Sequence, residues 1–261
     1  MLTKDTRFLM DKILVTGSSS GLGRYLHESL RAEAFVRNET VNDRIIIAEE
    51  LPYDCIIHCG WNLKPKVDSS KGLFYISESV KLTQQLLNIP HKKFVFISTI
   101  DVYPKNNSLH EEVEEINLND VQGIYGMSKL ISEEVVKSSK TYLILRLSAL
   151  LGKYTKYNTI TKVAMGKDIG ISKESSFNFI TYDHVKDFIR YYCSNDINGT
   201  YNVVAKNNVT LNSIIKRKNT SVKDGEWVYK TGNLSWVKLN NEIDNLTKTS
   251  MANYKSWSKS L

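Results

Sequence analysis

One stretch near the start of the chain, residues 12–26, constrains the fold more than any other. It opens with an apolar run, Lys12–Thr16, whose β-branched residues are typical of a buried strand. A loop of glycines and serines follows, and then a helical pattern that places Leu22, Leu26 and Leu30 on one face. The stretch therefore predicts a strand, a tight loop and a helix in immediate succession.

The glycines of this loop are spaced so that each one answers a different steric need. Gly17 suits the turn, Gly21 lets the backbone approach a ligand, and Gly23 allows the helix to lie close to the strand. Backbone N–H groups and the positive end of a helix dipole meet there, which suits a pyrophosphate. We expect cofactor contacts from the whole loop: Gly17, Ser18, Ser19, Ser20, Gly21, Leu22 and Gly23.

Strand and helix signals then alternate, which indicates an α/β fold with a doubly wound parallel sheet. The expected strands are 12–16, 34–38, 44–47, 53–59, 93–99 and 141–147, and the expected later helices are 71–87 and 124–138. After Leu151 the pattern loosens, with strand-like 177–180, a helix over 183–192 capped by Asp183, and strand-like 199–204. Residues 1–150 are therefore expected to form a dinucleotide-binding domain. Residues 151–261 would form a small substrate lobe, with about 177–205 returning to the first domain.

The charge balance raises the question of nucleic acid, because the 261-residue chain carries a net charge of +7. Its basic residues are scattered, apart from the short clusters 92–93 and 216–218, and aromatic residues are not interleaved with them. A solvated surface is favoured over nucleic-acid binding, and an anionic small substrate fits the charge equally well.

Targeting signals are not evident in the sequence. No apolar run reaches the length of about 18 residues that a membrane span needs. Residues 1–9, before Met10, lack the apolar core of a secretory signal, and we expect them to be an extension with little role in the fold. The expected location is the cytoplasm.

The cysteines favour the same compartment. Cys55, Cys59 and Cys193 are odd in number and have apolar surroundings, so reduced thiols are expected rather than disulfides. Cys55, His58 and Cys59 could also be metal ligands. Since alternate side chains of a strand face opposite ways and no fourth ligand has suitable spacing, we expect buried packing and no metal site.

Two residues four apart on a predicted helix, Tyr125 and Lys129, carry a possible acid–base function. An ammonium beside a phenol favours the phenolate, and a pKa lowered from about 10 towards 7.5 would let Tyr125 exchange a proton near neutral pH. Thr99 ends a predicted strand at the sheet edge where ligands bind, so it could hydrogen-bond the same substrate oxygen. With 14 tyrosines in a Lys-rich chain, one Tyr-x-x-x-Lys is also expected by chance.

The order of these motifs resembles the extended short-chain dehydrogenase/reductases, and most closely their nucleotide-sugar epimerase, dehydratase and ketoreductase branch. The resemblance covers roughly Lys12 to Ile214. Besides the glycine loop it rests on Asp54–His58, Ser79–Leu87, Ile97–Thr99 with Val102–Pro104, Tyr125–Lys129, and Asn178–Ile180 through Asp183–Val185.

The resemblance implies a Rossmann-type domain and assigns roles to single residues. Thr99, Tyr125 and Lys129 would be the catalytic triad, with Lys129 also holding the nicotinamide ribose. Further cofactor contacts would come from Cys59, Gly60, Tyr125 and Lys129. It also implies a nucleotide-sugar substrate and a homodimer formed through the helices 71–87 and 124–138.

Cofactor choice depends on the end of the second predicted strand. An acidic residue there commonly accepts the ribose hydroxyls of NAD, whereas this chain has Arg37, with Ser18, Ser19 and Arg24 expected nearby. A cation suits a 2′-phosphate, so we expect NADP, with NAD as the alternative.

The sequence also departs from the family pattern. Ser20 stands where the extended branch commonly has its middle glycine, Ser79 replaces a frequent Asn, and the lobe after Leu151 is short. The identity and size of the substrate therefore stay open.

Three functions remain under consideration. Dehydratases of this family follow the catalytic Thr with Asp and Glu, but here Ile100 and Asp101 occupy those positions, and Ile100 cannot donate a proton. We expect NAD(P)-dependent reduction of a keto group on a nucleotide-linked sugar, with Asp101 as a secondary acid or a solvent-facing residue. The alternatives are a nucleotide-sugar epimerase and a non-catalytic dinucleotide sensor.

Overall fold

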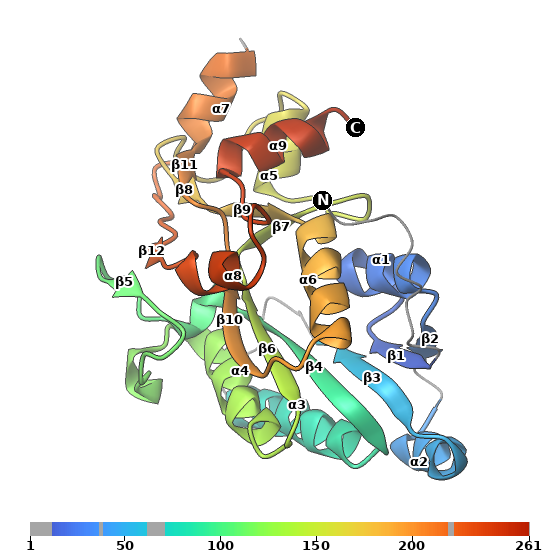
Figure 1. The fold of residues 1–261 in the computed structure, drawn as a ribbon. Helices are drawn as coiled ribbons and strands as arrows, with labels where there is room; N and C mark the ends of the chain where they lie inside the picture. Colours follow the sequence, from blue (N-terminus) through green and yellow to red (C-terminus); the bar gives the residue numbers. More distant parts are fainter. Residues whose placement is uncertain (1–11, 37–38, 62–70, 219–221, 261) are drawn as a thin grey trace.

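The computed structural model describes residues 12–36, 39–61, 71–218 and 222–260. A six-stranded parallel sheet in the order β10-β6-β4-β3-β1-β2 forms its centre (Figure 1). Its strands are β1 (Ile13–Thr16), β2 (Glu33–Phe35), β3 (Tyr53–His58), β4 (His91–Thr99), β6 (Tyr142–Leu147) and β10 (Gly199–Val203). The expected α/β fold with a doubly wound parallel sheet is confirmed.

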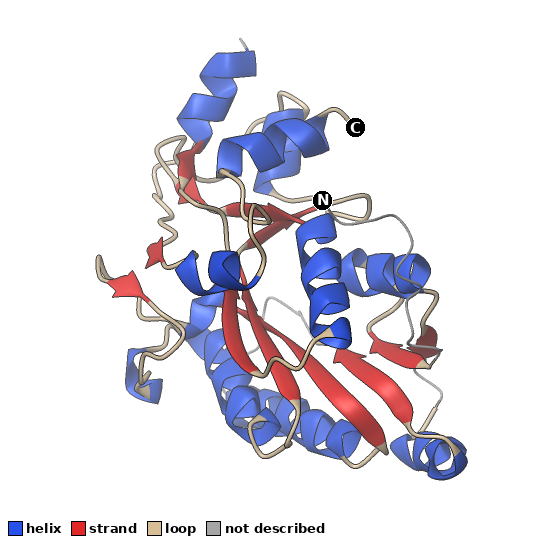
Figure 2. Cartoon of the chain, in the orientation of Figure 1, coloured by secondary structure: helices blue, strands red, loops and turns tan. Residues whose placement is uncertain are grey.

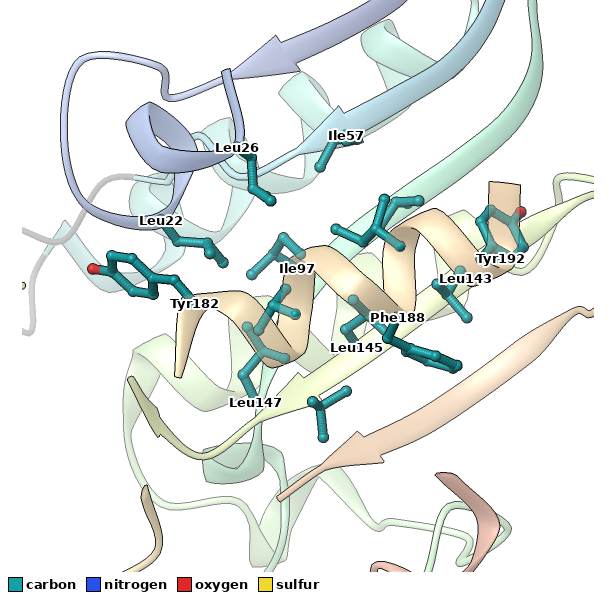
Figure 3. Close-up of a cluster of buried hydrophobic side chains, with 14 of the residues drawn as sticks. Leu22, Leu26, Ile57, Ile97, Leu143, Leu145, Leu147, Tyr182, Phe188 and Tyr192 are labelled. Carbon is teal, nitrogen blue, oxygen red and sulfur yellow. The ribbon is translucent and has the colours of Figure 1, made fainter. Parts of the chain in front are cut away.

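Helices cover both faces of this sheet, as Figure 2 shows, because successive strand residues point to opposite sides. On β4, Val95 and Ile97 face a cluster shared with α1 (Gly21–Leu30) and α6 (Tyr182–Ser194). Phe94 and Phe96 face the other side, where α3 (Gly72–Leu87) and α4 (Gly123–Val136) lie side by side. Figure 3 shows the first cluster, in which Phe188 of α6 packs against the strands.

The strand expected over 44–47 is wrong, because these residues lie in α2 (Val41–Glu50). Thr40 and Asp43 form a capping box that starts this helix, and Arg44 and Ala48, one turn apart, face inward. Ile46 and Ile47 are 65% and 49% exposed, and of the isoleucine run that resembled a strand Ile45 alone packs against the core.

The cap expected for α6 is also wrong. The helix begins one residue earlier than expected, and Thr181, not Asp183, accepts the backbone N–H of His184. Asp183 lies in the first turn, where a carboxylate favours the helix dipole, and it pairs with Lys186. At the other end of α6, the Lys93 ammonium donates to the carbonyls of Tyr192 and Asn195.

The second half of the chain contributes to the central sheet and to a second hydrophobic cluster. α6 and β10 pack into the central sheet, whereas short elements build a second cluster around Phe179, Leu211 and Trp257. These elements are β7 (Ala149–Leu151), α5 (Thr159–Ala164), β8 (Ser176–Phe177), β9 (Phe179–Thr181), β11 (Val209–Thr210), α7 (Leu211–Lys218) and α9 (Ser250–Ser258). The remaining elements are β5 (Leu109–His110), β12 (Asn233–Leu234), α8 (Val237–Glu242) and the 3₁₀ turns η2 (Ile100–Val102) and η3 (Leu118–Asp120).

None of the helices within the described ranges combines the length and the hydropathy needed to cross a bilayer.

Candidate active site

The glycine loop between β1 and α1 is pressed against the connection that follows β3. Gly17 has a φ of 71°, and a Cβ there would lie 2.8 Å from the Cα of Gly60. A Cβ on Gly23 would lie 2.3 Å from the carbonyl oxygen of Gly17, which is the close approach of helix and strand that the sequence predicts. Leu22 packs its side chain into the core, so only its backbone is available to a ligand, while Ser19 and Ser20 are exposed.

His58, at the end of β3, fixes the position of this connection. The backbone N–H of Gly60 donates to Thr16 Oγ1 at 2.8 Å, and Thr16 Oγ1 lies 2.9 Å from His58 Nδ1. His58 Nε2 lies 3.2 Å from Thr83 Oγ1, which donates to the carbonyl of Ser79. Burial, and to a smaller extent Lys129, keep the pKa of His58 well below its ordinary value. The neutral ring therefore accepts from Thr16 and donates to Thr83.

These contacts involve the histidine of the candidate metal cluster Cys55, His58 and Cys59. His58 has both ring nitrogens engaged with hydroxyl groups, as expected for a packed core residue. In the described part of the chain no group of three or more His, Cys, Asp or Glu side chains could hold a metal ion.

Lys129, in the middle of α4, carries a buried ammonium. The residue is only 2% exposed, and its Nζ donates to the carbonyl of Ile97 at 2.6 Å. The Trp61 ring centroid lies 3.6 Å from Nζ and the Phe96 ring centroid 4.7 Å. Burial lowers the pKa of Lys129 from 10.5 to about 7, with Cys59 and Glu133 acting in the opposite direction.

Tyr125 lies one helical turn before Lys129 and is partly buried. Burial, followed by the Asp101 carboxylate and Tyr75, raises the pKa of Tyr125 well above its ordinary value, whereas the Thr99 hydroxyl beside it acts to lower it. The expectation that Lys129 lowers this pKa does not hold in this structure. The reason is that the Lys129 ammonium is directed to the Ile97 carbonyl.

Asp101 lies close to Thr99 and to Tyr125 because η2 packs directly on α4. A Cβ on Gly126 would lie 2.4 Å from the Asp101 carbonyl oxygen, so only glycine permits this approach. The Asp101 N–H donates to Thr99 Oγ1 at 3.2 Å, and the carboxylate pairs with Lys105 at 2.7 Å. Asp101 is therefore neither an isolated acid nor a freely solvated residue.

A buried ion pair that the sequence analysis missed anchors α4 to the sheet. Glu133 and Arg146 of β6 are each 2% exposed or less, and Arg146 Nη2 lies 2.7 Å from Glu133 Oε2. Ser98 donates to the same carboxylate, and Arg146 also donates to the Tyr103 hydroxyl at 2.9 Å. Tyr125, Lys129 and Glu133 are spaced four apart and therefore share one side of α4. The ion pair of Glu133 with Arg146 turns that side towards the sheet. The i, i+4, i+8 spacing of Tyr125, Lys129 and Glu133 was the signal in the sequence that could have placed Glu133 on the same side of the helix.

The amino-acid sequence matches the profile of a known family. The profile of the NAD-dependent epimerase/dehydratase family matches residues 13–203, which is most of the chain. The chain belongs to this family. No curated protein matches its sequence.

Solved structures share the fold of this family member at low identity. The dTDP-4-dehydrorhamnose reductase of Bacillus anthracis str. Ames, in complex with NADP, is 18% identical with a TM-score of 0.80, over 97% of this chain and 100% of that one. The UDP-glucuronic acid 4-epimerase of Bacillus cereus, in complex with UDP-glucuronic acid and NAD, is 17% identical with a TM-score of 0.75, over 95% and 98%. An NAD-dependent NDP-hexosamine 5,6-dehydratase, TunA, is 14% identical with a TM-score of 0.74, over 96% and 98%.

The end of β2 (Glu33–Phe35) is the place at which the sequence predicts that the cofactor is selected. A hollow of about 290 Å³ there is lined by Phe35, Glu39, Thr40, Val41, Asn42, Leu82 and Gln85. Glu39 accepts from the Val36 N–H and pairs with Arg44 at 2.6 Å, so its carboxylate is already engaged. Arg24 pairs with Glu28 at 2.9 Å and lies over the Tyr154 ring, and Arg37 lies outside the described residues.

The three cysteines are free thiols. Cys55 and Cys193 are buried, while Cys59 is partly buried beside Gly60. Burial raises the pKa of Cys59 to about 12, so its thiol stays protonated and unreactive near neutral pH.

The buried Lys129 ammonium predicts how the stability of the folded protein depends on pH. Lys129 binds its proton more weakly in the folded protein, with a pKa of about 7 against 10.5, so between these values the unfolded chain holds more protons. Stability contributed by this group therefore rises with pH in that window, by at most about 1.4 kcal/mol per pH unit. The variant Lys129→Met lacks this dependence.

We expect the free energy of unfolding of wild type, measured in urea at pH 7, 8, 9 and 10, to rise relative to that of Lys129→Met across the series. Lys137→Met, at the exposed C-cap of the same helix, is the control and should parallel wild type. A constant difference between wild type and Lys129→Met from pH 7 to 10 would show that the ammonium titrates normally.

Proposed function

We propose that this member of the family is an NADP-dependent oxidoreductase that reduces a keto group on a nucleotide-linked sugar. One observation carries the proposal: the hydroxyls of Thr99 and Tyr125 lie together at the carboxyl end of β4, with Lys129 one turn away and the glycine loop alongside. Ligands of open α/β sheets bind at this edge of the sheet. A protein that only binds a dinucleotide has no need of an acid–base tyrosine there.

Tyr125 is suited to donate a proton in this reaction. Its raised pKa means that the phenol is protonated throughout the neutral range, as an acid for a carbonyl oxygen must be. Thr99 supplies a second hydroxyl to the same oxygen, and Lys129 supplies the cation that holds the ribose. When bound at the glycine loop, the nicotinamide cofactor supplies the hydride.

The neighbours of Thr99 favour reduction over dehydration. Elimination of water needs an acid for the departing hydroxyl, and Ile100, which follows Thr99, is an apolar residue only 6% exposed. The Asp101 carboxylate, one residue further on, is already engaged by the Lys105 ammonium at 2.7 Å. Reduction needs only the hydride and the Tyr125 proton, and the residues present supply the proton.

The test is incubation of the purified protein with NADPH and 4-keto sugar nucleotides, with absorbance at the nicotinamide band and NMR of the products. We expect one NADPH oxidised for each keto group reduced. An epimer formed with no net change in NADPH would identify an epimerase instead, and cofactor binding without turnover on any keto or hydroxy sugar nucleotide would support the sensor.

Tyr125→Phe should lower turnover at least about a hundredfold and leave cofactor affinity nearly unchanged, since it removes a positioned acid. Lys129→Ala should weaken both turnover and cofactor binding. Tyr157→Phe, at a residue 60% exposed, is the control and should behave as wild type. Full turnover by Tyr125→Phe would remove this tyrosine from the mechanism.

Cofactor choice forms a separate proposal. Glu39, the first carboxylate after β2 in the described chain, is engaged by Arg44 and by the Val36 N–H, which leaves it poorly placed to accept ribose hydroxyls. With Arg37 as a cation, a charge-assisted hydrogen bond worth about 1.5–3 kcal/mol would favour NADP over NAD by roughly 10- to 150-fold.

Calorimetric titration of wild type with both oxidised cofactors measures this ratio. Arg37→Gln should reduce the preference for NADP, while Arg31→Gln, at an exposed residue that ends α1, should not. Equal affinities of wild type for NADP and NAD would contradict the proposal.

A further inference from the structure

Trp61 covers the ammonium group that the proposed reaction needs. This residue directly follows Cys59 and Gly60 after β3, and its ring centroid lies 3.6 Å from Lys129 Nζ. The Trp61 ring also packs against Phe96 and His58, with centroid distances of 5.8 Å to each. Trp61 therefore rests on a preformed aromatic wall, with the ammonium held against its face.

The Lys129 ammonium is enclosed in this position. The Ile97 carbonyl accepts from it on the sheet side, while the rings of Trp61 and Phe96 take up the space on other sides. A cation over an indole is the strongest of the cation–π arrangements, and the attraction grows when both groups leave water. The three contacts together explain how the ammonium group is held while the residue is 2% exposed.

This position conflicts with the role that Lys129 has in the proposed function, on which the present inference rests. To hold the ribose, the ammonium must offer its protons to hydroxyls that arrive from outside the protein. In the structure its hydrogen bond goes to a backbone carbonyl of β4, and its open side is occupied by Trp61. The arrangement is a resting one.

The backbone before Trp61 is held in place, so any displacement of the indole must come from rotation about its own side-chain bonds. The Gly60 N–H is bonded to Thr16, and Gly60 packs against Gly17 so closely that a Cβ on Gly17 would lie 2.8 Å from its Cα. Trp61 thus stands at the border of the dinucleotide loop, where a ligand that reaches Lys129 must pass or displace it.

We propose that Trp61 is a positioning residue, which holds the Lys129 ammonium in the resting position and leaves it when a nicotinamide dinucleotide binds. The bound state must then displace a cation–π contact that the free protein makes. The affinity measured for the dinucleotide is lowered by the small fraction of molecules in which Trp61 is already displaced. Ligands that stop short of the nicotinamide ribose do not compete with Trp61.

The experiment compares two probes by calorimetry: oxidised NADP and adenosine 2′,5′-bisphosphate, which lacks the nicotinamide ribose. Trp61→Leu keeps an apolar side chain but no π face, and should bind NADP about three- to tenfold more tightly than wild type. Its affinity for the bisphosphate should match wild type. Trp61→Phe should fall between the two, because Phe attracts a cation less strongly than Trp. Trp227→Leu removes an exposed tryptophan of the second lobe and serves as the control.

Fluorescence gives a second readout that does not need Trp61→Leu to fold. The chain has four tryptophans, and NADP should change the emission of wild type and of Trp227→Leu but leave that of Trp61→Phe nearly unchanged.

Two outcomes overturn the inference while the proposed function stands. One is unchanged or weaker NADP binding by Trp61→Leu; the other is an equal gain for both probes, which would mean that Trp61 only stiffens the loop. Failure of wild type to bind NADP or NAD at all would overturn the proposed function, and this inference with it.

Discussion

An ammonium group removed from water is the constraint around which the site of this protein is built. Transfer of the Lys129 charge into the interior is unfavourable, and the lowered pKa of about 7 expresses that cost. A strand carbonyl and two aromatic rings offset part of it. No such arrangement is needed for folding alone, because an apolar residue would fill the same space without the penalty. We therefore interpret this buried, perturbed lysine, one helical turn from Tyr125, as part of the proposed functional site.

Two buried polar networks hold the sides of this site in register. On one side, Arg146 of β6 binds Glu133, which fixes α4 and with it Tyr125 and Lys129. On the other, His58 ties the ends of β1 and β3 to α3 through hydroxyl groups. Both networks join segments far apart in the sequence, and both lie at the carboxyl end of the sheet. The catalytic candidates are thus placed by interactions with core strands, while the glycine loop packs against Gly60, next to Trp61.

Much of the secondary structure could be predicted from local sequence patterns. The strand, loop and helix at 12–26 and most of the sheet strands follow from apolar runs of about the right length. The error at 44–47 arose because three consecutive isoleucines imitate a strand, while the capping box of Thr40 and Asp43 selects a helix. The cap of α6 was misplaced by two residues, since Thr and Asp are both good capping residues and only the geometry separates them.

What the sequence could not provide were pairings between distant residues. Glu133 and Arg146, or His58 and Thr83, have no local signal that identifies them as partners. The contact of Trp61 with Lys129 depends on how the connection after β3 meets α4. The direction of the Tyr125 pKa was also beyond reach, because it depends on burial and on Asp101, not on the four-residue spacing to Lys129. The spacing placed the two residues on one face, but the fold decides where the ammonium points.

The measurement closest to the central claim is a titration of Lys129 itself by heteronuclear NMR, with its side-chain resonance assigned by comparison with Lys129→Arg. In the ligand-free protein the resonance should titrate with a midpoint near pH 7, where burial has lowered the pKa. Saturation with oxidised NADP should move this midpoint, because Trp61 then leaves the ammonium, which faces the ribose instead. A midpoint near the ordinary lysine value of 10.5 in the ligand-free protein, unchanged by the cofactor, would contradict the account.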